Sequence, residues 1–185
     1  MNNPVDAGIR DRAQAALVEI ADAARQAGEL ALRDFRWGGR TSAQVHTKYG
    51  GSPVTTADLA VDRYLRERLG AAFPGDGWLS EETADDLLRL EMANLLVVDP
   101  IDGTRAFLTG DPRWAVSIAY IHDGRPIAGV IHAPALGRPT RPQSAAERGS
   151  TERRSMRREG RIWMARWSVG QDRWLGRSPK RPMSS

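Results

Sequence analysis

The segment from Asp99 to Thr104, Asp-Pro-Ile-Asp-Gly-Thr, offers two carboxylates, backbone carbonyls and a hydroxyl within a short stretch. It directly follows the apolar run 95–98, which predicts a buried strand. Pro100 fixes one backbone dihedral and Gly103 permits a conformation that strains other residues, so a tight turn can bring the oxygens together. Oxygen ligands of this kind suit a hard divalent cation. A hairpin turn is the alternative, since Asp-Gly after a hydrophobic run also predicts one.

Two further acidic segments lie upstream of this turn. Glu81 and Glu82 follow the short segment 77–79, which is consistent with the end of a strand, and Asp58 opens a helical pattern after Thr55. Each has a structural alternative. The glutamates would suit the acidic first turn of a helix over 84–90, and Asp58 would suit a helix N-terminus after a Thr cap. The three acidic segments together, in this order, favour a shared site.

With these motifs the chain resembles the inositol monophosphatase superfamily of metal-dependent, lithium-sensitive phosphatases. The signature of that family is D-P-[IL]-D-G-T followed by an aromatic residue, and residues 99–107 have Asp-Pro-Ile-Asp-Gly-Thr-Arg-Ala-Phe. The family also has a Glu-Glu pair, matched at 81–82, and a T-x-x-D segment, matched at 55–58. The resemblance covers about residues 10–137. It implies an α+β fold, a layered α/β sandwich of the sugar-phosphatase type, with the N-terminal domain largely present and the C-terminal domain missing.

The resemblance implies a metal centre built from this segment and the glutamates. Glu81, Asp99 and the carbonyl of Ile101 would bind an activating metal. Asp99 would also bridge to a second metal, of which Asp102 is a further ligand. We expect Mg²⁺, because all the offered ligands are oxygens and the sequence has no cysteine to suit a softer metal.

The resemblance also implies phosphate-binding and catalytic residues. Gly103 and Thr104 would meet the phosphate through their backbone amides at a helix N-terminus, where donors and dipole favour an anion. Thr104 and Glu81 would orient the attacking water. Glu82 and Asp58 would belong to the outer part of the metal site, Asp58 near a weaker third ion. The cations would neutralise the anionic substrate and lower the pKa of a bound water.

The implied activity is Mg²⁺-dependent hydrolysis of a small phosphorylated metabolite of the inositol monophosphate kind. Histidinol phosphate and 3′-phosphoadenosine 5′-phosphate are alternative substrates within the superfamily, which also suggests a homodimer. The alternative to an enzyme is a protein of a different functional class: an inactive, truncated remnant, or a metal-binding module with a basic tail. It is favoured by the short chain, which lacks the C-terminal metal-binding aspartate and the further strands of the family.

The charge of the chain changes sign near residue 138. Residues 1–137 hold 14 Lys and Arg against 19 Asp and Glu, a net charge of −5, whereas residues 138–185 hold 13 against 4, a net charge of +9. The second segment has only three branched aliphatic residues, so it can bury little on its own. We therefore predict an inositol-monophosphatase-like domain over 1–137 and a basic tail over 138–185. The tail is interpreted as the product of a shifted reading frame, as a disordered terminus, or as an arm that binds nucleic acid.

Hydrophobic periodicity predicts the elements around these motifs. They are a helix over 5–35, a helix over 57–72, strands over 95–98 and 114–121, a short helix over 104–108, and a hairpin through Asp123-Gly124 into 126–132. The sequence allows two roles for Lys48: a contact at the acidic site, or a solvated lysine in a loop. The chain has no apolar run long enough for a bilayer and no apolar core of a signal peptide, so we expect a cytoplasmic protein without a membrane partner. The absence of cysteine fits a reducing compartment.

Overall fold

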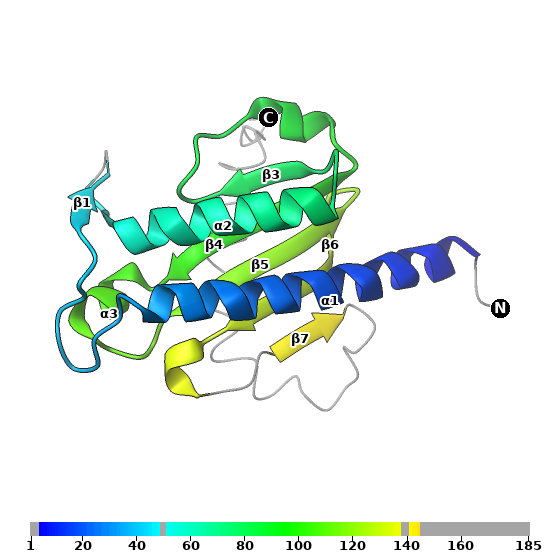
Figure 1. Ribbon diagram of the computed structural model, residues 1–185. Coiled ribbons are helices and arrows are strands. Elements are labelled where there is room, and N and C mark those ends of the chain that lie inside the picture. Colours follow the sequence, from blue (N-terminus) through cyan, green and yellow to red (C-terminus); the bar gives the residue numbers. More distant parts are fainter. Residues whose placement is uncertain (1–3, 49–50, 138–140, 145–185) are drawn as a thin grey trace, which may run out of the picture. The chain divides into compact units, whose positions relative to one another are not determined.

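The computed structural model describes residues 4–48, 51–137 and 141–144. Its elements, in which η denotes a 3₁₀ helix, follow the order α1 (Pro4–Leu32), β1 (Val45–Thr47), β2 (Pro53–Thr55), α2 (Thr56–Ala72), β3 (Gly77–Ser80), η1 (Leu87–Glu91), β4 (Asn94–Asp102), α3 (Thr104–Thr109), β5 (Ala115–His122), β6 (Arg125–His132), η2 (Pro134–Leu136) and β7 (Arg141–Ser144). Helices packed on a mixed sheet confirm the predicted α+β class (Figure 1).

Five strands form one sheet in the order β3-β4-β5-β6-β7. β3 pairs parallel with β4, and every later neighbour pairs antiparallel. The predicted hairpin between β5 and β6 is confirmed, and both turn residues, Asp123 and Gly124, have positive φ, as a tight two-residue turn requires. β1 and β2 form a separate antiparallel pair.

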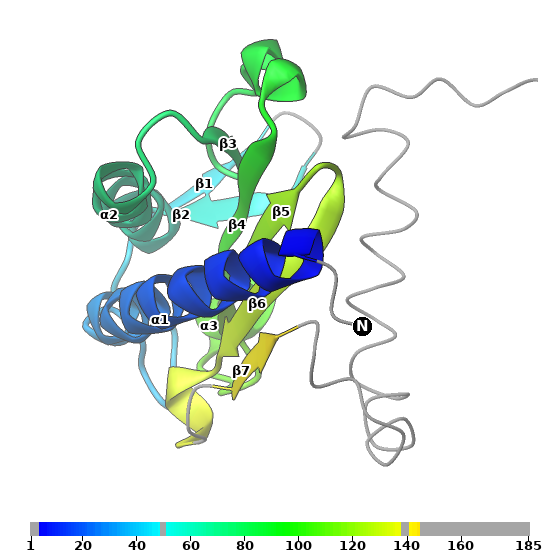
Figure 2. The same ribbon diagram turned by 90° about the vertical axis from the view of Figure 1, so that its right-hand side faces the viewer.

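Helices α1 and α2 lie side by side on one face of the five-stranded sheet (Figures 1 and 2). Their inward residues recur at helical spacing and are fully buried: Ala16, Ile20, Ala24, Ala27, Val61, Leu65 and Leu69. Alternate residues of β4 and β5 pack against them: Leu96, Val98, Ile118 and Tyr120. The neighbouring strand residues point to the other face of the sheet.

Helix α1 ends at Leu32, earlier than the predicted end at Phe35. The carbonyl of Asp34 accepts hydrogen bonds from Thr41 Oγ1 at 2.7 Å and from the Ser42 amide at 3.0 Å. The helix itself closes through two tighter i→i+3 bonds, from the amides of Arg33 and Asp34 to the carbonyls of Leu30 and Ala31. The predicted helix over 57–72 and the short helix over 104–108 correspond to α2 and α3.

Two local predictions around the acidic segments were wrong. β4 does not end at Val98 but continues to Asp102, with an irregular register between Asp99 and Asp102. Pro100 has no N–H to give to a strand ladder, which accounts for the irregularity. The alternative of a helix over 84–90 with the glutamates in its first turn also fails, because the helix that forms, the 3₁₀ helix η1, begins only at Leu87.

The sheet continues past the predicted domain boundary at residue 137. β7 covers residues 141–144 and pairs antiparallel with β6. Residues 145–185, most of the predicted basic tail, lie outside the described residues, so the division at 137 stays a prediction. Among the described helices, none combines the length and the apolar character that a membrane span needs.

Candidate functional site

The predicted acidic residues meet at the carboxyl ends of β3 and β4. These strands run parallel, with Ser80 opposite Val98, so Glu81, the first residue after β3, is level with Asp99 in the last part of β4. The Glu81 amide donates to the Val98 carbonyl at 3.2 Å, which continues the pairing by one residue. The apolar strand pattern thus brings together acids that are distant in sequence.

Asp99 lies in a field of negative charge. Burial raises the pKa of its carboxyl well above the ordinary value, and the neighbouring carboxylates of Glu81 and Asp102 raise it further. Asp58 acts in the same direction. Like charges held close together disfavour ionisation, whereas a bound cation would favour it. The site therefore concentrates negative charge at the point where the family resemblance predicts metal ligands.

The Asp58 carboxylate contacts two segments, the start of α2 and the start of α3. It forms a capping box with Thr55 at the start of α2, in which the Thr55 amide donates to Asp58 Oδ2 at 2.8 Å and the Asp58 amide donates to Thr55 Oγ1 at 3.2 Å. The structural alternative for Asp58 is therefore confirmed. Its other oxygen, Oδ1, lies 3.4 Å from Thr104 Oγ1 at the start of α3. Burial raises the pKa of this carboxyl as well.

Gly103 and Thr104 form the junction between β4 and α3. Gly103 has φ of +93°, and a Cβ there would lie 2.9 Å from the Arg113 carbonyl, so only glycine fits. Thr104 Oγ1 lies 3.1 Å from the Ile101 carbonyl in addition to its contact with Asp58. A hydroxyl has one proton and cannot donate fully to both oxygens. Thr104 thus links a predicted metal-binding carbonyl to α2.

Lys48 belongs to the site, a point that the sequence left open. Its Nζ lies 2.8 Å from Glu82 Oε1 and 3.3 Å from Glu81 Oε1. Burial raises the pKa of the Glu82 carboxyl, and the Lys48 ammonium opposes that effect. The loop after β1 therefore places the Lys48 ammonium beside the carboxylates of both glutamates.

Sequence reasoning missed two polar residues beside these acids. Asp62, one turn after Asp58 on α2, accepts hydrogen bonds from Ser80 and Thr83, on either side of the glutamate pair. Ser117 lies opposite Asp99 in the β4–β5 pairing, is fully buried, and has a hydroxyl without a hydrogen-bond partner among the described residues. Spacing of four residues after Asp58 was a signal for Asp62. No local signal marks Ser117, because its position depends on strand register.

The predicted ligands offer oxygen atoms to a divalent cation. Within residues 4–48, 51–137 and 141–144, no three His, Cys, Asp or Glu side chains are grouped so as to hold a metal ion. The acids are thus neighbours whose charges interact, not a formed coordination sphere. Their chemistry still fits a hard cation, because every predicted ligand is an oxygen and the half-buried Asp99 has carboxylate neighbours. The ligand set of Glu81, Asp99, Ile101 and Asp102 stays a prediction.

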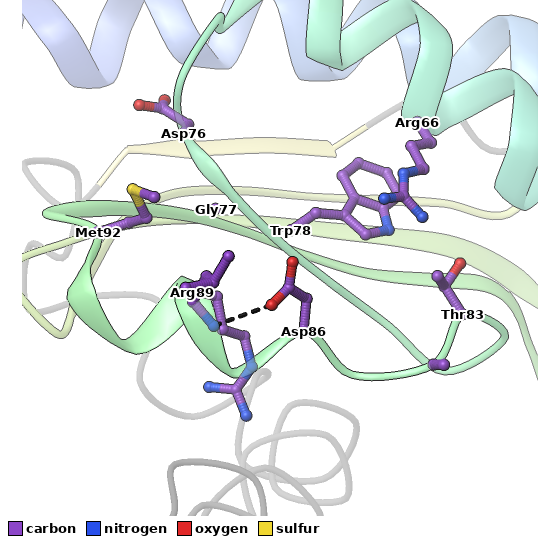
Figure 3. A pocket seen from close by; sticks show the side chains of 10 residues that line it. Arg66, Asp76, Gly77, Trp78, Thr83, Asp86, Arg89 and Met92 are labelled. Carbon is purple, nitrogen blue, oxygen red and sulfur yellow. Dashed lines mark hydrogen bonds between the residues drawn. The ribbon is translucent and has the colours of Figure 1, made fainter.

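A separate pocket of about 210 Å³ lies beside β3 and η1 (Figure 3). It is lined by side chains that include Arg66, Trp78, Asp86, Leu88 and Met92. None of the predicted site residues lines it. The pocket is therefore not the site that the acidic segments form.

Comparison with known proteins decides the family. The family model described as "Inositol monophosphatase family" matches residues 13–174, a range that extends beyond the predicted boundary at 137. The chain belongs to this family. The family resemblance inferred from the residue 99–107 signature is thereby confirmed.

Curated relatives in the inositol monophosphatase family have different names. The histidinol-phosphatase of Mycobacterium tuberculosis is 44% identical over 100 residues, which are 54% of this chain and 38% of the relative. The 3′(2′),5′-bisphosphate nucleotidase CysQ of Aggregatibacter actinomycetemcomitans is 38% identical over 123 residues, 65% and 44% of the two chains. The inositol-1-monophosphatase of Mesorhizobium japonicum is 38% identical over 125 residues, 67% and 46%. The chain spans less than half the length of these relatives.

Solved structures of the family share the fold. The extragenic suppressor protein suhB of Bartonella henselae has a TM-score of 0.63 at 33% identity, covering 74% of this chain and 50% of that one. The IMPase of Thermotoga maritima has a TM-score of 0.60 at 29% identity, covering 73% and 48%. An IMPase/NADP phosphatase solved with Mg²⁺ and phosphate matches at 22% identity with a TM-score of 0.51, which shows a shared fold alone.

Proposed function

We propose that this chain is part of a Mg²⁺-dependent phosphomonoesterase that acts on a small phosphorylated metabolite. The observation that carries the proposal is the strand pairing that brings Glu81 level with Asp99, where burial and the carboxylates of Glu81 and Asp102 raise the pKa of the half-buried Asp99 carboxyl. Asp99 and Asp102 stand in the signature, and Glu81 in the Glu-Glu pair, of a family whose curated relatives are named as phosphatases. A charge cluster of this kind is what a divalent cation and an anionic substrate require.

Four residues would hold the metal: Glu81, Asp99, Asp102 and, through its carbonyl, Ile101. When bound, Mg²⁺ would neutralise charge on the phosphate and lower the pKa of a coordinated water. The Thr104 hydroxyl, 3.1 Å from the Ile101 carbonyl, supports a place for this side chain at the edge of the metal site.

The remaining roles concern water and phosphate. Glu81 and Thr104 orient the attacking water, and the amides of Gly103 and Thr104 contact the phosphate. Asp58 and Glu82 act from outside the ligand set, Asp58 through its contact with Thr104 and Glu82 through its ion pair with Lys48. A cytoplasmic location is proposed from the absence of cysteine, and a homodimer from the family resemblance alone.

Three substrates should be compared in one assay, because the relatives are named for three different activities. We would measure phosphate release by the purified chain from inositol monophosphate, histidinol phosphate and 3′-phosphoadenosine 5′-phosphate. The proposal expects release from at least one substrate with Mg²⁺ and none after excess chelator. Release that continues undiminished in excess chelator would exclude the metal mechanism.

A second candidate is a metal-binding module without turnover. It is favoured by coverage, because the chain spans less than half the length of the curated relatives that are named for an activity. Mg²⁺ binding that is measurable by calorimetry, combined with no phosphate release from any of the three substrates, would support the module over the enzyme.

A further inference from the structure

The carboxylate of Asp62 joins helix α2 to both sides of the glutamate pair. Ser80 Oγ donates to Asp62 Oδ1, and Thr83 Oγ1 donates to Asp62 Oδ2 at 2.6 Å. Asp62 is 7% exposed and Ser80 3% exposed. Each oxygen of one buried carboxylate thus has its own hydroxyl donor. The two donors flank Glu81 and Glu82 in the chain.

Backbone contacts extend this anchor into the segment. The Glu82 amide donates to Ser80 Oγ at 3.2 Å, so the hydroxyl that donates to Asp62 also accepts from the backbone. The Glu81 amide donates to the Val98 carbonyl at 3.2 Å. Residues 81–86 belong to neither helix nor strand. Beyond the strand-like bond of the Glu81 amide, the position of Glu82 and Thr83 therefore depends on these side-chain contacts.

We propose that Asp62 is a positioning residue that holds Glu81 and Glu82 against the Asp99 carboxyl. Asp58, one turn earlier on α2, contacts Thr104 at the start of α3, so one helix face fixes two of the segments that form the site. The inference rests on the proposed function only in taking Glu81 as a metal ligand. Side chains that orient metal ligands typically change metal affinity when they are replaced.

Asp62→Asn tests this role, since it keeps the shape but places an amide donor against one of the two hydroxyls. Asp76→Asn is the matched control. The Asp76 carboxylate also accepts two side-chain hydrogen bonds, from Asn94 at 2.8 Å and Tyr120 at 2.6 Å, and it does not contact the glutamate segment. Two quantities are measured on each protein: amide hydrogen exchange at Glu81 and Glu82 without Mg²⁺, and Mg²⁺ affinity by calorimetry.

We expect Asp62→Asn to speed exchange at Glu82 about tenfold or more and to weaken Mg²⁺ binding about 10- to 100-fold, with neither effect in Asp76→Asn. Thr83→Val, which removes one donor only, should shift both quantities in the same direction if Asp62→Asn does not fold. Unchanged exchange at the segment overturns the inference. So does an equal Mg²⁺ affinity in both variants, which would make Asp62 a structural anchor only. If the unsubstituted chain binds no Mg²⁺, that contradicts the proposed function, and the exchange data alone decide whether Asp62 holds the segment.

Discussion

Lys48 Nζ lies 2.8 Å from Oε1 of Glu82, whose side chain is only 3% exposed. The same ammonium lies 3.3 Å from Glu81 Oε1. This contact joins the loop after β1 to the end of β3 and balances part of the negative charge around Asp99. Through it, a cationic side chain meets one of the predicted metal ligands, Glu81.

Replacing Lys48 should destabilise the chain. In Lys48→Met, the Glu82 carboxylate keeps its buried position but loses its cation, which we expect to lower the free energy of unfolding by about 1–3 kcal/mol. Urea unfolding without Mg²⁺ measures the change. Arg113→Met is the control, because Arg113 is 80% exposed in its pair with Asp111 and should change stability by less than about 0.5 kcal/mol. Equal losses in the two variants would show that the Lys48 pair is no stronger than a surface pair.

Two helix glycines should respond oppositely to alanine. A Cβ on Gly28 of α1 would lie 2.6 Å from His132 Cδ2 and 3.1 Å from Pro134 Cγ, so Gly28→Ala should cost about 1–3 kcal/mol of stability. A Cβ on Gly70 of α2 would meet nothing within 4 Å, so Gly70→Ala should gain about 0.5–1 kcal/mol from helix propensity. Thermal unfolding of both variants checks the pair of signs. A stabilised Gly28→Ala would mean that α1 packs less closely on β6 than described.

The His132 imidazole should make stability depend on pH. Burial lowers its pKa, and the Arg25 guanidinium lowers it further, while Glu29 opposes this effect. In the unfolded chain the imidazole binds its proton near pH 6.5, but in the folded chain it does so only at lower pH. The unfolded state therefore holds more protons between these values, and the free energy of unfolding should fall as pH decreases through that window.

Urea unfolding at about pH 7.5 and about pH 5 measures this effect. His132→Gln should reduce the loss of stability on acidification, whereas the same substitution at the exposed His46 should leave it unchanged. An identical loss in the parent and in His132→Gln would assign the pH dependence to other groups.

The sequence predicted what depends on local pattern. The signature ending in Thr104 identified the family, and the periodicity of α2 and β5 predicted their limits closely. Sequence patterns did not predict the features that depend on tertiary contacts. The partners of Asp62 lie 18 and 21 residues away, and Ser117 meets Asp99 only through strand register. The predicted end of α1 was also too late, because after Leu32 the chain tightens into i→i+3 bonds from Arg33 to Leu30 and from Asp34 to Ala31.

The reading frame beyond codon 138 can be tested on the gene. The net charge changes from −5 over residues 1–137 to +9 over residues 138–185, and branched aliphatics become rare. We predict that another frame there continues a strand-rich sequence and encodes an aspartate after a tryptophan, the further metal ligand of the family pattern. The nucleotide sequence, read in all three frames, decides the matter. If neither alternative frame encodes such a continuation, the basic tail needs a functional explanation.

The most direct test of the account is the Mg²⁺ dependence of phosphate release in Asp99→Asn. Because the substitution removes one of several repelling carboxylates, the variant should fold at least as well as the parent, and urea unfolding checks this point. Asp111→Asn, at an acid paired with Arg113 outside the predicted ligand set, is the control. We predict that the parent and Asp111→Asn release phosphate with Mg²⁺ and that folded Asp99→Asn is slower by about a hundredfold or more. Release by Asp99→Asn at the rate of the parent would contradict the claim that this carboxylate is at the centre of a metal-dependent phosphatase site.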